Sequence, residues 1–228
     1  MLGTISFSNE KIFSVTGQVT SILSLPFYEI ALAQGGIFEK YRLHKTGRLF
    51  QSQRISRLLL PTDFHHWDFF KDYGLRPYDP LPVLQGLGDW IALHSLAKHG
   101  LDPKKSSVLI QGKRSSPEIW SVAEKLCPFV KELVISLEEG GDRLQAHLYR
   151  EFGISPASFR SQTTATLSFS PEEEKQNGVF VQLSQIDSPD FCSITLKNKE
   201  LPSSFPPLSL ISLLLQTGKI SCSSLEYT

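Results

Sequence analysis

The second half of the chain alternates short apolar runs with segments in which apolar residues recur every three or four positions. A short apolar run that ends at a glycine or a polar residue is typical of a buried strand, and the wider spacing is typical of a helix that covers a sheet. Strands joined by helices usually pair in parallel through right-handed crossovers. The predicted strands are Ser107–Gln111, Glu132–Ser136, Ile154–Arg160, Thr164–Ser170, Val179–Leu183 and Ser193–Leu196.

Helix signals between these strands support the same alternation. Ser116, Pro117 and Glu118 predict a helix start, because serine is a good N-cap, proline suits the first turn and an acid is favoured near that end of the helix. Glycines are suited to closing the later helices. The predicted helices begin at Ser116 and end before Pro128, run from Gly140-Gly141 to Gly153, and span Leu208–Gln216 with Gly218 beyond.

The first hundred residues are less regular. Their clearest helix is Pro82–Lys98, which is apolar on most faces and is therefore expected between layers. We expect an α/β chain with a Rossmann-like, mostly parallel sheet and flanking helices in the C-terminal half, preceded by a smaller α+β N-terminal region. The expected domains are residues 1–80 and 81–228, and an α+β second half is the alternative. The other predicted elements are a helix at Leu25–Gln34 and strands at Ile37–Leu43, Arg48–Gln53 and Ile55–Leu60.

Composition narrows the function classes. Among 228 residues, 23 basic residues balance 23 acids, so overall charge gives no reason to expect a nucleic acid or an anionic membrane as partner. The most apolar run, Leu208–Leu215, is far shorter than the roughly 20 residues that span a bilayer. Three scattered cysteines without a CxxC spacing argue against a disulfide framework or a cysteine zinc site. We therefore expect a cytoplasmic globular protein.

The candidate cofactor site follows the first strand of the second half. In a doubly wound sheet, ligands bind beyond the carboxyl ends of the strands, often with a phosphate at a helix N-terminus. Backbone N–H groups, two hydroxyls and two cations at this turn suit a phosphate. Glu138, just past the second strand, is placed to accept hydrogen bonds from ribose hydroxyls. The residues of the predicted phosphate turn are Gly112, Lys113, Arg114, Ser115 and Ser116.

The segments SVLIQGKRSSPE, ELVISLEE and ATLSFSP, followed by GVFVQLS, carry a family resemblance. Over residues 107–187 the chain resembles the nicotinamide-nucleotide domain of the shikimate dehydrogenase and glutamyl-tRNA reductase type. The resemblance implies a Rossmann fold, NAD as cofactor and Ser170 beside it, because in those families the corresponding strand ends in small polar residues next to the cofactor. It covers about a third of the chain.

The chain departs from those families at their glycine fingerprint. The fingerprint is GxGxxG or GxGxxA, and Arg114 stands where its second glycine lets the backbone approach the pyrophosphate. If a dinucleotide binds, Glu138 and Glu139 favour NAD over NADP, because carboxylates repel a 2′-phosphate. The families also use a lysine and an aspartate from the first lobe for proton transfer, and no motif maps either one here.

Other clusters have ordinary interpretations. Adjacent His65 and His66 point in different directions on a strand or helix and seldom chelate one ion, so we expect no metal site there. The basic segment Lys40–Lys45 favours an edge strand whose lysines are in contact with solvent. Cys127 lies among apolar residues before a proline, which predicts a buried and unreactive thiol. GxSxG, P-loop and HExxH motifs are absent.

Two functions remain open, and whether the chain is an enzyme stays undecided. The favoured hypothesis is a degenerate Rossmann-like protein that acts as a non-catalytic binding, regulatory or assembly module with a protein partner. The alternative is a divergent NAD-binding oxidoreductase with phosphate held at Gly112–Ser116. A homodimer through the apolar helix Leu208–Gln216 is a further option, with burial of that helix inside one chain as its alternative.

Overall fold

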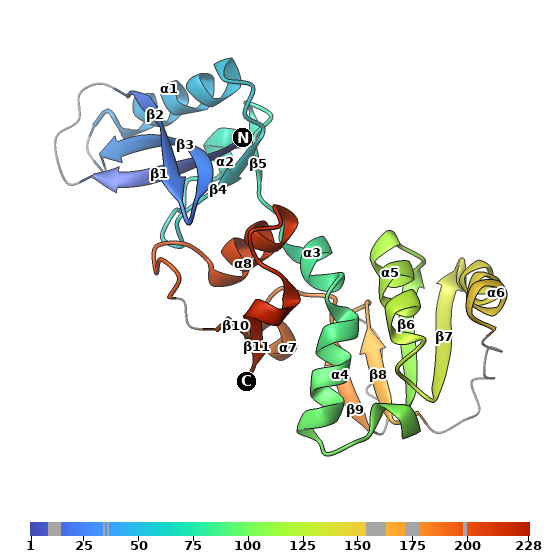
Figure 1. The fold of residues 1–228 in the computed structure, drawn as a ribbon. Helices are drawn as coiled ribbons and strands as arrows, with labels where there is room; N and C mark the ends of the chain where they lie inside the picture. Colours follow the sequence, from blue (N-terminus) through green and yellow to red (C-terminus); the bar gives the residue numbers. More distant parts are fainter. Residues whose placement is uncertain (9–14, 34, 36, 154–162, 172–177, 198–199) are drawn as a thin grey trace. The chain divides into compact units, whose positions relative to one another are not determined.

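The chain folds into two compact units. The computed structural model describes residues 1–8, 15–33, 35, 37–153, 163–171, 178–197 and 200–228. The first unit comprises Met1–Asp79 with Glu200–Leu210, and the second comprises Pro80–Lys199 with Ile211–Thr228. Each unit has its own sheet, so each is described separately (Figure 1).

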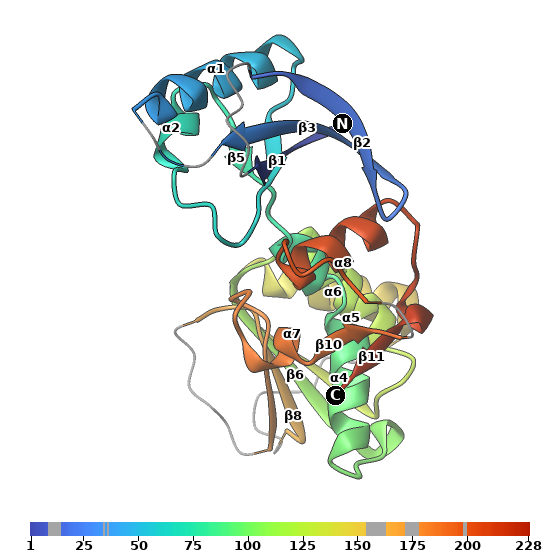
Figure 2. The same ribbon diagram turned by 90° about the vertical axis from the view of Figure 1, so that its left-hand side faces the viewer.

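The first unit contains a five-stranded sheet in the order β2-β3-β1-β4-β5. Strand β2 pairs antiparallel with β3, whereas β1 pairs in parallel with β3 and β4, and β4 with β5. Helix α1 and the short helix α2 lie side by side against it (Figures 1 and 2). The bounds are β1 Leu2–Ser8, β2 Gly17–Ile22, β3 Leu25–Ala33, α1 Glu39–Ser52, β4 Arg57–Leu59, α2 Asp68–Lys71 and β5 Arg76–Pro77.

Three predicted elements of this unit were wrong in type. The helix expected at Leu25–Gln34 is strand β3, which is paired on both edges and buries residues from both faces, so its apolar positions lack strict alternation. The strands expected at Ile37–Leu43 and Arg48–Gln53 are both parts of helix α1. The buried positions of α1 lie at helical spacing and are Leu43, Thr46, Gly47 and Phe50. The strand expected at Ile55–Leu60 is present as β4.

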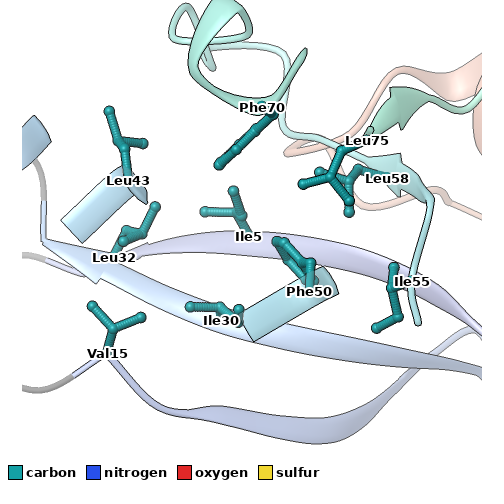
Figure 3. Packing of buried hydrophobic residues seen from close by; sticks show 10 residues of the cluster. All are labelled: Ile5, Val15, Ile30, Leu32, Leu43, Phe50, Ile55, Leu58, Phe70 and Leu75. Carbon is teal, nitrogen blue, oxygen red and sulfur yellow. The ribbon is translucent and has the colours of Figure 1, made fainter. Parts of the chain in front are cut away.

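The core of the first unit lies between the sheet and its helices. Buried side chains from β1, β3, α1, β4 and α2 form one cluster, and Phe70 of α2 is fully buried within it (Figure 3). Ring pairs extend this core, with Phe70 stacked on Phe64 at 5.5 Å and edge-on to Phe50 at 6.4 Å. The buried cluster is Ile5, Val15, Ile30, Leu32, Leu43, Phe50, Ile55, Leu58, Phe70 and Leu75.

The second unit contains a four-stranded, fully parallel sheet in the order β7-β6-β8-β9. Gln111 on β6 is paired with Ser136 on β7 and Ser168 on β8, which fixes the register at the carboxyl ends of the strands. The prediction of an α/β chain with a Rossmann-like parallel sheet and flanking helices in its second half is confirmed. The bounds are β6 Ser107–Arg114, β7 Glu132–Glu139, β8 Ala165–Ser168 and β9 Val179–Gln182.

The helices of the second unit begin and end largely as their capping residues predict. Ser116 Oγ accepts a hydrogen bond from the Ile119 N–H at 3.3 Å, and Gly153 ends α6 with a φ of 69°. The single helix expected at Pro82–Lys98 is interrupted between residues 85 and 88. The bounds are α3 Leu81–Gln85, α4 Gly88–Lys98, α5 Pro117–Leu126 and α6 Gly141–Phe152.

The C-terminal part of the chain adds α7 (Pro189–Cys192), the antiparallel pair β10 (Ile194–Leu196) and β11 (Leu225–Tyr227), and α8 (Pro207–Gln216) (Figure 2). The predicted strand Ile154–Arg160 lies outside the described residues. Within the described ranges, no helix combines the length and apolar character needed to cross a bilayer. Helix α8 buries Leu210, Ile211, Leu213 and Leu214 to 3% exposure or less.

Candidate functional site

The carboxyl end of β6 is the topological switch point of the second unit. From β6 the chain runs to β7 on one side, and it later returns to β8 on the other side. Ligands of open α/β sheets bind outside the strand ends at such a point. The predicted phosphate residues therefore lie at the correct edge of the sheet (Figure 1).

The predicted turn at Gly112–Ser116 begins later than expected. Strand β6 continues through Arg114, because Gly112 pairs with Leu137 and Arg114 pairs with Glu139. The Ser115 N–H extends this ladder by donating to the Glu139 carbonyl at 3.0 Å. Three of the five residues expected in a turn are thus strand residues, and the chain turns only at Ser115–Ser116.

Gly112 allows close packing rather than a tight turn. A β-carbon added there would lie 3.3 Å from the Phe169 Cβ and 3.4 Å from the Leu137 Cδ2. The Phe169 N–H donates to the Gln111 carbonyl at 2.9 Å, which holds the segment after β8 against the end of β6. Phe169 thus packs against Gly112, the one fingerprint glycine that this segment retains.

The side chain of Arg114 is directed to its neighbour on β7. Its Nε lies 2.8 Å from the Glu139 Oε2, and the two side chains are 77% and 63% exposed. A pair this exposed contributes about 0–1 kcal/mol to stability. The pair matters because of where it lies. The Arg114 guanidinium, which the sequence suggested for a phosphate, is bound to the Glu139 carboxylate instead.

Both serine hydroxyls of the turn are engaged by helix α5. Ser116 Oγ caps the helix, and Ser115 Oγ accepts a hydrogen bond from the Trp120 Nε1–H. Pro117 supplies no N–H to a ligand. Each hydroxyl oxygen therefore accepts a hydrogen bond from α5, which fixes both serine side chains against the helix.

The same tryptophan connects α5 with α6. The Trp120 and His147 rings lie 5.0 Å apart, and His147 Nε2 lies 2.8 Å from Glu124 Oε1.

Gly140, which precedes α6, has a φ of +81°, and a β-carbon there would lie 2.8 Å from the Ser115 Cβ. The turns after β6 and β7 are therefore packed directly against each other.

Glu138 and Ser170, the other predicted site residues, lie on opposite sides of β6. Glu138 is an exposed residue near the end of β7, whereas Ser170 follows β8 and is 3% exposed. Ser168 Oγ donates to the Ser170 carbonyl at 2.7 Å. Within the described ranges, Ser170 Oγ and the Gln111 Nε2 are buried without a hydrogen-bond partner.

Sequence reasoning missed the parts played by Trp120 and Phe169. Trp120 lies four residues after the predicted N-cap Ser116. Residues at this spacing are neighbours on a helix surface, so the sequence does indicate that the indole lies near the first turn of the helix. Phe169 carries no comparable signal, because its approach to Gly112 depends on the pairing of β8 with β6.

A second cluster lies in the first unit, where the basic segment Lys40–Lys45 belongs to helix α1 rather than to the predicted edge strand. Arg42 Nη2 donates to the Ala33 carbonyl at 3.1 Å and also to the Gly35 carbonyl. Its Nε is buried and has no partner in the part of the chain that the structure describes. A cavity of about 10 Å³ lies here, lined by Phe7, Leu32, Ala33, Glu39, Arg42, Leu43, Phe64 and His66.

His66 belongs to this cluster through a close contact with Glu39. Its Nε2 lies 2.9 Å from Glu39 Oε1, and its ring packs edge-on against Phe64 and Phe69. Among the residues with described positions, no three histidine, cysteine, aspartate or glutamate side chains gather as a metal site would require.

The buried thiol leads to a prediction about reactivity. Burial, with a smaller contribution from the Glu124 charge, raises the pKa of Cys127 to about 11. Because the thiolate is the nucleophile, Cys127 stays protonated and unreactive at neutral pH and gains reactivity only as pH rises toward that value. We expect an aromatic disulfide reagent to titrate the exposed Cys192 and Cys222 rapidly and Cys127 only after unfolding. Rapid reaction of three thiols in the native protein contradicts this.

Comparisons with known proteins give structural likeness only. No protein-family model matches the sequence, and no curated protein matches it. The chain is similar to shikimate dehydrogenase from Aquifex aeolicus, with 13% identity, 98% of this chain and 94% of that chain covered, and a TM-score of 0.34. The Rossmann-like arrangement expected from the sequence is carried by the second unit itself, whose parallel sheet has the order β7-β6-β8-β9.

Two other solved structures show similar values. A chorismate mutase/shikimate 5-dehydrogenase fusion protein from Clostridium acetobutylicum has 12% identity, covers 84% of this chain and 80% of that chain, and has a TM-score of 0.31. L-Tryptophan dehydrogenase from Nostoc punctiforme has 12% identity and a TM-score of 0.32, and the match covers 63% of this chain and 44% of that chain. These likenesses identify no activity for this chain.

Proposed function

We propose that this protein is a non-catalytic binding module whose Rossmann-like unit does not hold a dinucleotide and which acts through a protein partner. The observation that carries the proposal is the set of contacts at the end of β6. There Arg114 pairs with Glu139, and Ser115 is bonded through both its N–H and its hydroxyl. The groups that would recognise a pyrophosphate serve the fold instead.

The cost of opening this arrangement supports the proposal. A pyrophosphate approaching the end of β6 would have to separate Arg114 from Glu139 and break the hydrogen bond from Trp120 to Ser115. Each intramolecular hydrogen bond contributes about 0.5–1.5 kcal/mol, and lost packing adds to that cost. Glu138 places a further acid at the end of the neighbouring strand, where it opposes an anionic ligand.

A second candidate function, oxidoreduction with NAD, is favoured by one observation. The Gln111 Nε2 and Ser170 Oγ are buried at the carboxyl edge of the sheet and lack partners within the described residues. An unsatisfied buried polar group costs about 1–3 kcal/mol, so a ligand that bonded these atoms would stabilise the fold. In this alternative, Glu138 holds the ribose and Lys113 with Arg114 holds the phosphates.

Trp120 provides a built-in reporter that separates the two functions. A dinucleotide at the end of β6 would lie close to this indole, and NADH would quench its fluorescence by energy transfer. We expect no saturable quenching up to millimolar NADH, and the same response from a Trp120→Phe variant after correction for absorbance. Saturable quenching that disappears in Trp120→Phe would overturn the proposed function. The double variant Lys113→Ala with Arg114→Ala then tests whether these cations hold the phosphates.

A further inference from the structure

The surface at the start of α1 carries large hydrophobic side chains that are exposed to solvent. Ile37 is 97% exposed, Phe38 67% and Tyr41 66%, although all three are large hydrophobic residues. Residues three or four apart are neighbours on a helix surface, so Phe38 lies beside Tyr41 and Arg42. Exposed apolar residues that gather in this way mark interaction sites. We call Ile37, Phe38 and Tyr41 the α1 patch.

The cavity described above lies next to the α1 patch, because both include the first turns of α1. It has room for about one water-sized group, and among the described residues that line it the buried Arg42 Nε is a donor without a hydrogen-bond partner. A donor of this kind requires an acceptor, such as a carbonyl or carboxylate oxygen. The Glu39 carboxylate that also lines the cavity is already paired with His66, whose side chain is 46% exposed.

Charge on α1 indicates the chemistry of the occupant. The helix carries four basic residues against one acid, whereas the whole chain is balanced. Lys45 lies one turn after Tyr41 on the same face, and the exposed Arg48 lies one turn further, so cations border the α1 patch along the helix. A positive rim around an apolar centre complements a segment that is apolar in the middle and acidic at its ends.

From these three observations we infer that the α1 patch and the adjacent cavity bind an acidic, apolar peptide segment of a partner protein. Apolar side chains of that segment cover Phe38 and Tyr41, an acceptor oxygen of the peptide meets Arg42 Nε, and flanking acids lie near Lys45 and Arg48. The inference rests on the proposed function and names its partner surface. An anionic lipid surface is the competing occupant, and the experiment includes it.

The test selects peptides from a random displayed library on the intact chain. We expect enriched sequences to combine an aromatic or aliphatic residue with neighbouring acids. A synthetic peptide of the enriched sequence should bind about tenfold or more weakly to the double variant Phe38→Ser with Tyr41→Ser, because exposed aromatic anchors dominate such interfaces. Arg42→Lys keeps the charge but removes the Nε donor, and it should weaken binding as well. Tyr149→Ser, an exposed aromatic change on α6, is the matched control and should leave the affinity unaltered.

Three outcomes overturn the inference. The first is the absence of any enriched sequence, the second is an enriched peptide that ignores Phe38 and Tyr41, and the third is flotation of the protein with phosphatidylserine vesicles through these residues in place of peptide binding. The same preparation is titrated with NADH. Failure of the peptide test without NADH binding removes only this surface, whereas NADH binding removes the proposed function itself.

Discussion

Replacement of Phe70 by alanine is expected to lower the free energy of unfolding of the first unit by about 3–5 kcal/mol. Phe70 is fully buried and packs its ring against Phe50, Phe64 and Trp67. Truncation leaves a cavity that neighbours on several elements cannot fill together. Since Phe64 also lines the cavity beside Arg42, the change is expected to disturb the α1 patch's neighbourhood too.

Hydrogen exchange followed by mass spectrometry measures this loss unit by unit. Peptides from β1, β3 and α1 should exchange much faster in Phe70→Ala, while peptides from β6 and β7 should keep their protection. Phe38→Ala, an exposed change in the same unit, is the control and should shift stability by no more than about 0.5 kcal/mol. Equal protection of Phe70→Ala and wild type would show that the ring does not organise this core.

Replacement of Gly140 by alanine is expected to cost the second unit about 2–3 kcal/mol. A left-handed conformation accounts for about 1 kcal/mol of this in any non-glycine residue. The remainder comes from the new β-carbon, which would lie 2.8 Å from the Ser115 Cβ and must push the turns after β6 and β7 apart. This packing is part of what closes the end of β6.

Gly153 provides the matched control for this prediction. Its φ is +69°, close to that of Gly140, but an added β-carbon would meet nothing within 4 Å. Gly153→Ala should therefore cost only the conformational part, about 1 kcal/mol. Urea unfolding of the two variants isolates the contact between the turns. Equal losses in both variants would mean that Gly140 does not hold Ser115 in place.

The helices and strands of the second unit were predicted well because each carries a clear signal in its own sequence. The N-cap at Ser116, the glycine after α6 and the apolar runs of β6 and β7 each depend on neighbours in sequence, and the structure contains these features. Strand β3 was misread because it buries residues from both of its faces, so the expected alternation of apolar and polar positions is lost. Helix α1 was misread because its basic residues obscured the helical spacing of its buried positions.

The site was harder to predict than the fold. The sequence placed Gly112, Lys113 and Arg114 at the correct edge of the sheet but ended β6 three residues early, because the length of a strand is set by its partner. Glu139 extends the ladder only once β7 lies alongside. The approach of Phe169 to Gly112 likewise depends on tertiary pairing.

Calorimetric titration of the intact protein with NAD, NADH, NADPH and ATP tests the central claim most directly. Protein concentrations high enough to detect millimolar binding are required, since such affinities correspond to only about 4 kcal/mol. The proposed function predicts no saturable heat with any of the four, because the phosphate-recognising groups at the end of β6 are engaged within the fold. Saturable heat with a dinucleotide, lost on mutating Lys113 and Arg114, would contradict it and establish a divergent nucleotide site.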